Sequence, residues 1–278
     1  MKFFMETKEL FDKLNDPGIR IADCRFTLGN PDQGESAYKL GHIPGSVYFH
    51  LERDLSGEVK EHGGRHPLPD MKLFAEKLKK AGIGNEETLV VYDDGDYAFA
   101  SRFYWMMKYA GHENVYLLSG GYQAWVQAGY PITSVIPKNE DKEYALDLKE
   151  DLLTDYITIK QFTENKAEFV LIDSREEKRY LGIEEKIDKA AGHIPGAINK
   201  VWMDGIANGR FKSAEEQLAR FSDIDKDQKV VVYCGSGVTA APNYLALKMA
   251  GYENVSVYIG SFSDYISYEG NSIETVRK

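Results

Sequence analysis

The sequence predicts an α/β fold that is built twice, with each half forming a mainly parallel sheet flanked by helices. Two observations carry this prediction. Strand-like runs alternate with helical patterns along the whole chain. Segments of the first half also return in the second half, about 140 to 150 residues later, a period that indicates duplication of a domain because solenoid repeats are shorter.

The expected elements follow in order along the first half. The strand-like runs are 19–23, 88–94 and 114–118, and the helical runs that end in glycine are 70–82 and 101–111. The second half repeats these segments in the same order. The matching pairs are 19–25 with 169–175, 41–47 with 192–198, 89–93 with 230–234, and 110–125 with 250–265.

The repeat suggests where the domains begin and end. We predict a first domain over 1–133, a charged linker over 134–152 and a second domain over 153–278. The first copy has Asp93 where the second has Cys234, so we expect the first copy to be non-catalytic. It also carries an additional polar, glycine-containing loop at 51–69.

The composition limits the class of protein. Hydrophobic residues make up 43% of 278 residues and charged residues 28%, which indicates a globular protein. A net charge of −10 is unsuited to nucleic acid. Two cysteines cannot form a disulfide framework, and no apolar run is long enough for a signal peptide or a membrane span. We expect a soluble cytoplasmic protein with neither a membrane nor a nucleic acid as partner.

Cys234 lies where chemistry is expected, directly after a predicted parallel strand. The residues 235–237, Gly-Ser-Gly, let the backbone curl and turn its N–H groups toward one point. A helix predicted over 239–251 has Thr239 near its cap and Pro242 in its first turn. Its dipole favours thiolate at Cys234, whereas an ordinary cysteine, with a pKa of about 8.5, is mostly protonated.

Two other interpretations of this cysteine are a structural role and a phosphatase nucleophile. A cysteine by itself is often a small buried hydrophobe, but the strand, the two glycines and the capped helix together disfavour that role. A cysteine phosphatase needs an arginine six residues after the nucleophile to clamp phosphate, and that position holds Ala240. The phosphatase interpretation therefore fails.

The chain resembles the tandem-domain rhodaneses, the thiosulfate and 3-mercaptopyruvate sulfurtransferases, over essentially its full length. The motifs that carry the resemblance are the paired GHIPG segments, Asp23-Cys24-Arg25 and Asp173-Ser174-Arg175, the loop from Cys234 to Thr239, and GSFSDY at 260–265. The resemblance implies two rhodanese-like domains. It also implies a Cys234 persulfide that forms from a small sulfur donor and is emptied by a thiol, a thioredoxin-like protein or cyanide, with no metal or organic cofactor.

The loop favours mercaptopyruvate as the donor. Thiosulfate-preferring members of the family usually have arginine and lysine directly after the cysteine, where this chain has Gly235 and Ser236. Two other functions stay open, a thiosulfate-preferring sulfurtransferase and a low-turnover persulfide carrier for a partner protein.

The resemblance also assigns residues to the site. Arg179 is expected to bind the anionic end of the donor, together with the loop residues Gly235, Gly237, Val238 and Thr239. A second binding arginine found in some mercaptopyruvate enzymes has no counterpart in 183–189. Only Lys186 and Lys189 are available there, so that contact is left open.

Ser236, His66 and Glu52 resemble a serine–histidine–acid relay. The family usually has aspartate at the place of Glu52, which leaves the role of this residue uncertain.

Several remaining residues are given structural roles. Cys24 is expected to be a buried thiol, and a metal site built from His50, His62 and His66 is disfavoured by their spacing. The expected partners of the other groups are backbone carbonyls for His42 and His193, carboxylates for Arg25 and Arg175, and the protein core for 103–107.

Overall fold

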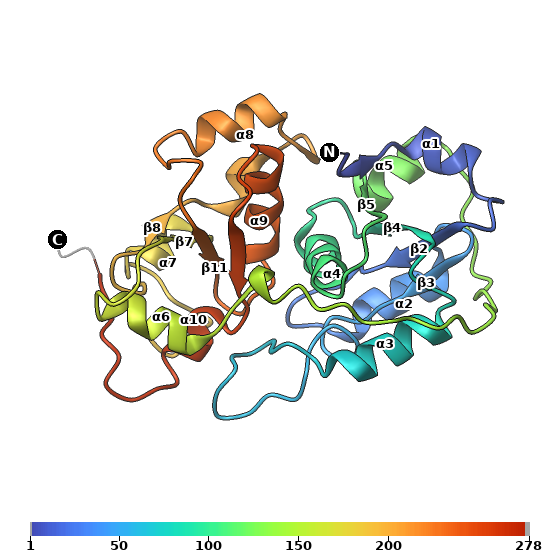
Figure 1. Ribbon diagram of the computed structural model, residues 1–278. Helices are drawn as coiled ribbons and strands as arrows, with labels where there is room; N and C mark the ends of the chain where they lie inside the picture. The colour runs from blue at the N-terminus through green and yellow to red at the C-terminus, as the bar shows by residue number, and fades with distance from the viewer. Residues whose placement is uncertain (1, 276–278) are drawn as a thin grey trace. The chain divides into compact units, whose positions relative to one another are not determined.

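The computed structural model describes residues 2–275 and divides into two compact units (Figure 1). Unit 1 contains the described chain up to Gly57, then Pro69–Lys149 and Asn208–Arg210. Unit 2 contains Glu58–Leu68, Glu150–Ala207 and the described chain from Phe211 onward. Most of the additional loop of the first repeat thus packs with the second unit.

Unit 1 holds a five-stranded parallel sheet in the order β1-β5-β4-β2-β3. Its strands are β1 (Phe4–Met5), β2 (Ile19–Asp23), β3 (Ser46–Tyr48), β4 (Thr88–Tyr92) and β5 (Val115–Leu118). Its helices are α1 (Thr7–Asp12), α2 (Asp32–Leu40), α3 (Met71–Lys80), α4 (Ala98–Tyr109) and α5 (Gly121–Gln127).

Unit 2 repeats this sheet, with the parallel order β6-β12-β11-β7-β8. Its strands are β6 (Leu153–Thr154), β7 (Val170–Asp173), β8 (Ile198–Asn199), β11 (Val230–Tyr233) and β12 (Val255–Tyr258), and a separate two-stranded sheet joins β9 (Ile206–Ala207) to β10 (Arg210–Phe211). Its helices are α6 (Tyr156–Thr163), α7 (Glu177–Tyr180), α8 (Ala214–Arg220), α9 (Ala240–Met249) and α10 (Ser261–Tyr265), with 3-10 turns η1 (Glu150–Leu152) and η2 (Trp202–Gly205). The predicted fold class is confirmed.

The strands and helices follow the predicted ranges closely. β2 coincides with the predicted strand 19–23, and α9 lies inside the predicted helix 239–251. The helix predicted at 101–111 is the exception, because α4 begins earlier, at Ala98. Tyr97 precedes it with a positive φ of 64°, a conformation that a sequence pattern does not reveal for tyrosine.

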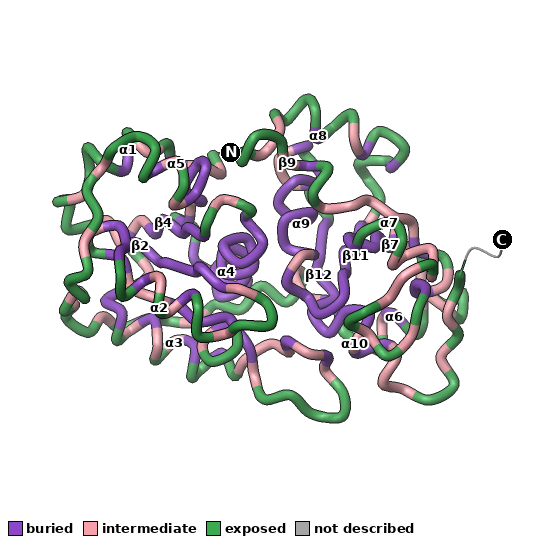
Figure 2. Tube along the Cα trace, turned by 180° about the vertical axis from the view of Figure 1, so that it is seen from behind, coloured by how far each residue is buried: buried purple, intermediate pink, exposed green. Residues whose placement is uncertain are grey.

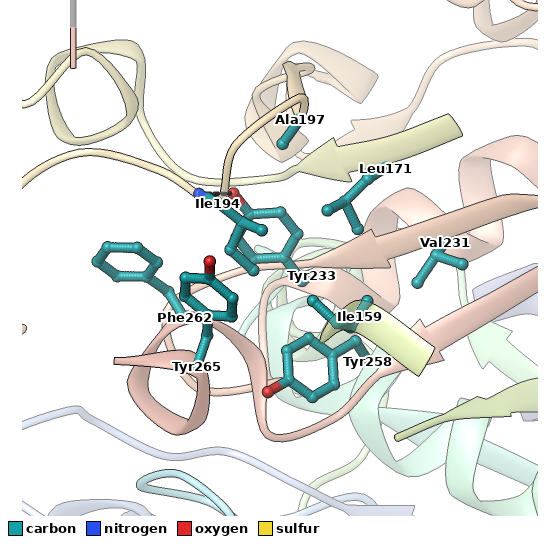
Figure 3. Packing of buried hydrophobic residues seen from close by; sticks show 9 residues of the cluster. All are labelled: Ile159, Leu171, Ile194, Ala197, Val231, Tyr233, Tyr258, Phe262 and Tyr265. Carbon is teal, nitrogen blue, oxygen red and sulfur yellow. Dashed lines mark hydrogen bonds between the residues drawn. The ribbon is translucent and has the colours of Figure 1, made fainter. Parts of the chain in front are cut away.

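The core of unit 2 explains why all four residues of β11 are apolar or aromatic. Val231 and Tyr233 point to one face of the sheet and pack with residues of α6 and α10 (Figure 3). Val230 and Val232 point to the opposite face, since side chains alternate along a strand. Both faces are buried, and α9 packs against β11 and β12. This packing holds the end of β11 rigidly.

The helices α4 and α9 follow the strands β4 and β11, and both are deeply buried (Figure 2). In α4, residues 103–107 are all buried, which confirms their assignment to the core. A helix that is apolar on every side belongs inside a fold rather than on its surface. None of the helices in residues 2–275 has the length and hydropathy needed to cross a membrane.

The Asp-x-Arg motifs form the same ion pair in both units. Arg25 donates from Nε and Nη2 to the Asp23 carboxylate and from Nη2 to the carbonyl of Gly41. Arg175 makes the matching bonds to Asp173 and to the carbonyl of Gly192. Each guanidinium thus ties a strand end to the start of a GHIPG turn, as predicted.

The histidines of the two turns also have the predicted role. The Nδ1 atoms of His42 and His193 each lie 2.7 Å from a backbone carbonyl oxygen, that of Tyr38 and that of Tyr180. Neither histidine lies in the candidate site described below.

Candidate active site

Cys234 follows β11 directly, at the carboxyl end of the central strand of its sheet. The Gly237 N–H donates to its Sγ at 3.1 Å, and the Ser261 hydroxyl lies 3.9 Å from the same sulfur. Gly237 has a φ of +81°, which glycine adopts without steric cost. The turn therefore aims a backbone donor back at the sulfur, and this donor stabilises negative charge on it.

The rest of the loop also presents backbone donors. Within the described chain, no acceptor is recorded for the N–H groups of Val238 and Thr239, which precede the first turn of α9. Thr239 occupies the N-cap position, but its hydroxyl makes no capping hydrogen bond. Pro242 lies in the first turn of α9, as predicted. These groups suit an anion at the helix N-terminus.

A second segment, at the start of α10, holds the cysteine loop in place. The Cys234 N–H donates to the Ser261 hydroxyl at 3.1 Å, and the N–H groups of Phe262 and Ser263 donate to the carbonyls of Cys234 and Gly235. Ser261 has a φ of 57°, which is uncommon for a residue other than glycine. Sequence reasoning noted the GSFSDY motif but did not assign Ser261 a contact with the sulfur.

The loop Glu58–Leu68 brings His66 to the cysteine loop, where its Nδ1 lies 2.8 Å from the Ser236 hydroxyl oxygen. Both residues are buried. The loop is held by contacts with α10 and the residues that follow it: the Gly63 N–H donates to Asp264, and His62 Nδ1 lies 2.8 Å from the Ser267 hydroxyl. The predicted pairing of His66 with Ser236 is confirmed across a separation of 170 residues.

Glu52, the third member of the expected relay, belongs to unit 1. Its side chain is exposed, and its backbone N–H donates to Nδ1 of His50 at 3.1 Å. Its part in a relay stays a prediction.

Arg179, at the end of α7, lies beside the cysteine loop. It donates from Nε to Glu185 at 2.9 Å and from Nη2 to Asp188 at 2.6 Å. A Cβ placed on Gly235 would lie 3.3 Å from the Arg179 Nη2 atom. Lys186 and Lys189 are both exposed, and Lys186 pairs with Glu184.

A second guanidinium at the loop was missed by sequence reasoning. Arg65 forms an ion pair through Nη1 with Asp188, the same carboxylate that pairs with Arg179. A Cβ on Gly235 would lie 3.0 Å from the Arg65 Nη2 atom. The only signal in the sequence was its place next to His66.

The matching loop of unit 1 contains its own hydrogen-bond acceptor, the Asp93 side chain, and burial raises the pKa of this carboxyl group to about 8. The buried Asp93 carboxylate accepts the backbone N–H groups of Gly95, Tyr97, Phe99 and Ala100, at 2.9 to 3.2 Å. This side chain occupies the cradle itself.

Cys24 is a buried free thiol, as predicted. Burial raises its pKa well above the ordinary value, and the carboxylates of Asp23, Asp93 and Asp54 raise it further. This thiol is therefore held in its protonated, unreactive form.

In the part of the chain that the structure describes, neither a metal site nor another surface hollow offers an alternative to the Cys234 loop as the candidate active site. Residues 2–275 contain no group of three histidine, cysteine or acidic side chains arranged to hold a metal ion. A surface hollow of about 710 Å³ in unit 2, lined in part by Phe162, Phe169 and Lys229, includes no residue of the cysteine loop.

Comparisons with known proteins agree with the geometry. The family model for the rhodanese-like domain matches twice, at residues 6–128 and 158–268. A probable 3-mercaptopyruvate sulfurtransferase of Pseudomonas aeruginosa is 38% identical over 269 residues, which is 95% of this chain and 94% of that protein. The thiosulfate sulfurtransferase of Cricetulus griseus is 33% identical, over 90% of this chain and 85% of its own length.

A solved structure matches as well. The crystal structure of SseA from Escherichia coli, described as a 3-mercaptopyruvate sulfotransferase with the rhodanese fold, has a TM-score of 0.85. It is 30% identical, and the match covers 95% of this chain and all of SseA.

Proposed function

Because the chain belongs to the rhodanese family of sulfurtransferases, we propose that it transfers a sulfane sulfur from 3-mercaptopyruvate or thiosulfate, through a persulfide on Cys234, to a thiol, a thioredoxin-like protein or cyanide. Mercaptopyruvate is the preferred donor in this proposal. The observation that carries it is the Cys234 sulfur at the end of β11, which accepts the Gly237 N–H at the N-terminus of α9. Unit 1, with Asp93 in the matching loop, is proposed to be non-catalytic.

With thiosulfate, the Cys234 thiolate attacks the outer sulfur of the donor. A bond forms between the two sulfurs, the bond from the outer sulfur to the sulfonate sulfur breaks, and sulfite leaves with the electron pair. With mercaptopyruvate, the bond from sulfur to carbon breaks and pyruvate leaves as its enolate, which then takes up a proton. In both cases the acceptor attacks the outer sulfur of the persulfide and restores the thiolate.

Ser236 and His66 are proposed to serve the mercaptopyruvate reaction. The enolate that leaves needs a proton, and the contact between His66 Nδ1 and the Ser236 hydroxyl offers a route for one. Sulfite needs no proton on departure. The Ser236–His66 pair therefore supports the preference for mercaptopyruvate.

The place and the partners of the protein are part of the same proposal. Both cysteines are free thiols, which fits a reducing compartment such as the cytoplasm. The acidic composition does not favour nucleic acid as a partner. The donors are small anions, and their contacts are proposed to come from Arg179 and the loop residues Gly235, Gly237, Val238 and Thr239.

The proposal is tested by mass spectrometry of the protein after incubation with each donor. We expect one adduct of about 32 Da, the mass of a single sulfur atom, on the wild-type chain and on Cys24→Ser, and none on Cys234→Ser. An adduct that persists on Cys234→Ser contradicts the proposal.

Steady-state turnover with cyanide as acceptor then ranks the two donors. Faster turnover with thiosulfate would make the protein a thiosulfate-preferring member of the family. A single stoichiometric adduct without repeated turnover would instead indicate a persulfide carrier for a partner protein.

A further inference from the structure

Two guanidinium groups meet beside the residue that follows the nucleophile. Arg65 and Arg179 come from different segments, the loop Glu58–Leu68 and the end of α7. Asp188 accepts from both of them, with Oδ1 paired to Arg65 and Oδ2 to Arg179. The Asp188 side chain is fully buried. One carboxylate therefore positions both cations.

Gly235 leaves the space into which both guanidiniums reach. A Cβ there would lie 3.0 Å from Arg65 Nη2 and 3.3 Å from both Arg179 Nη2 and Asp188 Oδ2. Its φ is not in the left-handed region, so backbone conformation does not require glycine at this position. The absence of a side chain at 235 is instead explained by the side chains that fill its place.

Arg65 has side-chain N–H donors that its ion pair with Asp188 does not use. Its backbone N–H donates to the Ser263 hydroxyl, and Nη1 pairs with Asp188. In the described structure, Nε and Nη2 of Arg65 have no recorded acceptor, and the side chain is 34% exposed. Guanidinium groups bind carboxylate and sulfonate oxygens through paired N–H donors.

Resting on the function proposed above, we propose that Arg65 is a donor-binding residue that, with Arg179, holds the anionic end of the sulfur donor beside Gly235. It supplies the second cation for which the segment 183–189 has no arginine. The bound group is a carboxylate or a sulfonate, which both guanidiniums can reach next to the Cys234 loop.

The local charges support this role. Three arginines, Arg65, Arg175 and Arg179, are balanced by three carboxylates, Asp173, Glu185 and Asp188. A cluster that is neutral as a whole does not attract anions over long distances. Specificity then depends on the N–H donors that remain after the internal pairs are made, and Arg65 has two such nitrogens.

Arg65 also changes what the loop sequence implies about donors. Gly235 and Ser236 carry no positive charge, which by itself disfavours the thiosulfate dianion. The two nitrogens of Arg65 that remain after its pair with Asp188 bring hydrogen-bond donors to the same place from another loop. We therefore expect the protein to use both donors and to depend on Arg65 more strongly for thiosulfate, because a hydrogen bond from a guanidinium strengthens with the charge of its acceptor.

The test measures steady-state kinetics of Arg65→Ala with each donor and cyanide. We expect the KM for mercaptopyruvate to rise about tenfold and that for thiosulfate by more, the loss expected for a charge-assisted hydrogen bond, with kcat changed less than about threefold. Arg65→Lys keeps the positive charge but lacks the paired N–H donors of a guanidinium. Its affinity for thiosulfate should therefore lie between those of Arg65→Ala and the wild type. Lys60→Ala, on the same loop and exposed, is the matched control and should behave as wild type.

Two results would overturn the assignment. One is a KM for both donors that stays within twofold of wild type in Arg65→Ala. The other is a loss of kcat equal for all donors and for the acceptor, which indicates a disturbed fold rather than a lost contact.

Calorimetric titration with pyruvate and with thiosulfate separates this inference from the proposed function. If the wild-type protein turns over neither donor, the proposed function fails. The role of Arg65 is then tested by the affinity for the two anions alone. Weaker binding of either anion to Arg65→Ala, but not to Lys60→Ala, supports the anion site. Equal binding, or no binding to the wild type, overturns it.

Discussion

The loops after β4 and β11 occupy the same place in two copies of one fold, yet they use their backbone N–H donors in opposite ways. In unit 1 the Asp93 carboxylate accepts four backbone N–H groups. In unit 2 the Cys234 sulfur accepts the Gly237 N–H, and the N–H groups of Val238 and Thr239 have no recorded acceptor in the described chain. One cradle is filled by its own side chain, and the other keeps N–H donors that could serve the persulfide proposed above.

The two cysteines extend the comparison. Each is 1% exposed, so burial does not distinguish them. Cys24 lies among the carboxylates of Asp23, Asp93 and Asp54, whereas Cys234 faces the Gly237 N–H and the Ser261 hydroxyl. The surrounding charges and donors, rather than depth, set which thiol can act as a nucleophile.

The largest effect on turnover is expected when the aspartate of the unit 1 loop replaces the cysteine of the unit 2 loop. Cys234→Asp should abolish turnover with both donors, because a carboxylate cannot form the persulfide. The turnover assay with cyanide measures this, and circular dichroism checks that the fold is retained.

The reverse exchange is the control for this comparison. Asp93→Cys should leave the chain with a single persulfide by mass spectrometry, because the carboxylates of Asp94 and Asp96 next to position 93 repel anionic donors. Two adducts per chain would show that a cysteine by itself restores the first site.

Removing the Asp93 carboxylate should lower the free energy of unfolding by about 3 kcal/mol, since Asp93→Ala leaves buried N–H donors without their acceptor. Urea denaturation measures the change. Asp94→Ala removes the same charge from an exposed neighbour and should cost less than about 0.5 kcal/mol. Equal losses in the two variants would mean that the cradle contributes little.

His66→Ala should lower kcat with mercaptopyruvate about a hundredfold, the size of a general acid–base contribution, and kcat with thiosulfate much less. The reason is that the pyruvate enolate needs a proton and sulfite does not. His62→Ala, on the same loop, is the control, because His62 contacts Ser267 and stacks on Tyr268. Equal losses for both donors would argue against the relay, and Glu52→Gln tests its third member.

The smallest effect concerns Cys24. Its raised pKa means that the folded chain keeps a proton that the unfolded chain releases above about pH 8.5, so stability falls as pH rises from there toward the folded pKa, by up to about 1.4 kcal/mol per pH unit. Cys24→Ala should remove this part of the slope in urea denaturation series and leave turnover unchanged. Identical slopes in the two proteins would contradict the assignment.

Much of the fold could be predicted because its signals are local. The alternation in 19–23 and the apolar run in 230–233 mark strands. Gly237 marked the tight turn at the nucleophile, and the spacing to Ala240 excluded a phosphatase. The start of α4 was predicted wrongly, because the helix begins at Ala98 directly after Tyr97, whose positive φ has no signature in the sequence.

The site was predicted less completely. His66 and Ser236 were paired only through a family resemblance, and the structure confirms their contact. Arg65 and Ser261 were not foreseen, because each touches the cysteine loop through a contact distant in sequence and neither belongs to a periodic pattern.

The amino-acid sequence alone determined that the domain is duplicated, the three longest strands of the first sheet with their counterparts in the second, and which copy has a cysteine in the loop after its central strand. These features follow from the period of side chains and from residue types at one turn. Only the tertiary structure decided that Glu58–Leu68 joins unit 2 and brings Arg65, next to His66, to the cysteine loop. Contacts between segments more than a hundred residues apart depend on how the chain packs. The local sequence around each residue does not predict them.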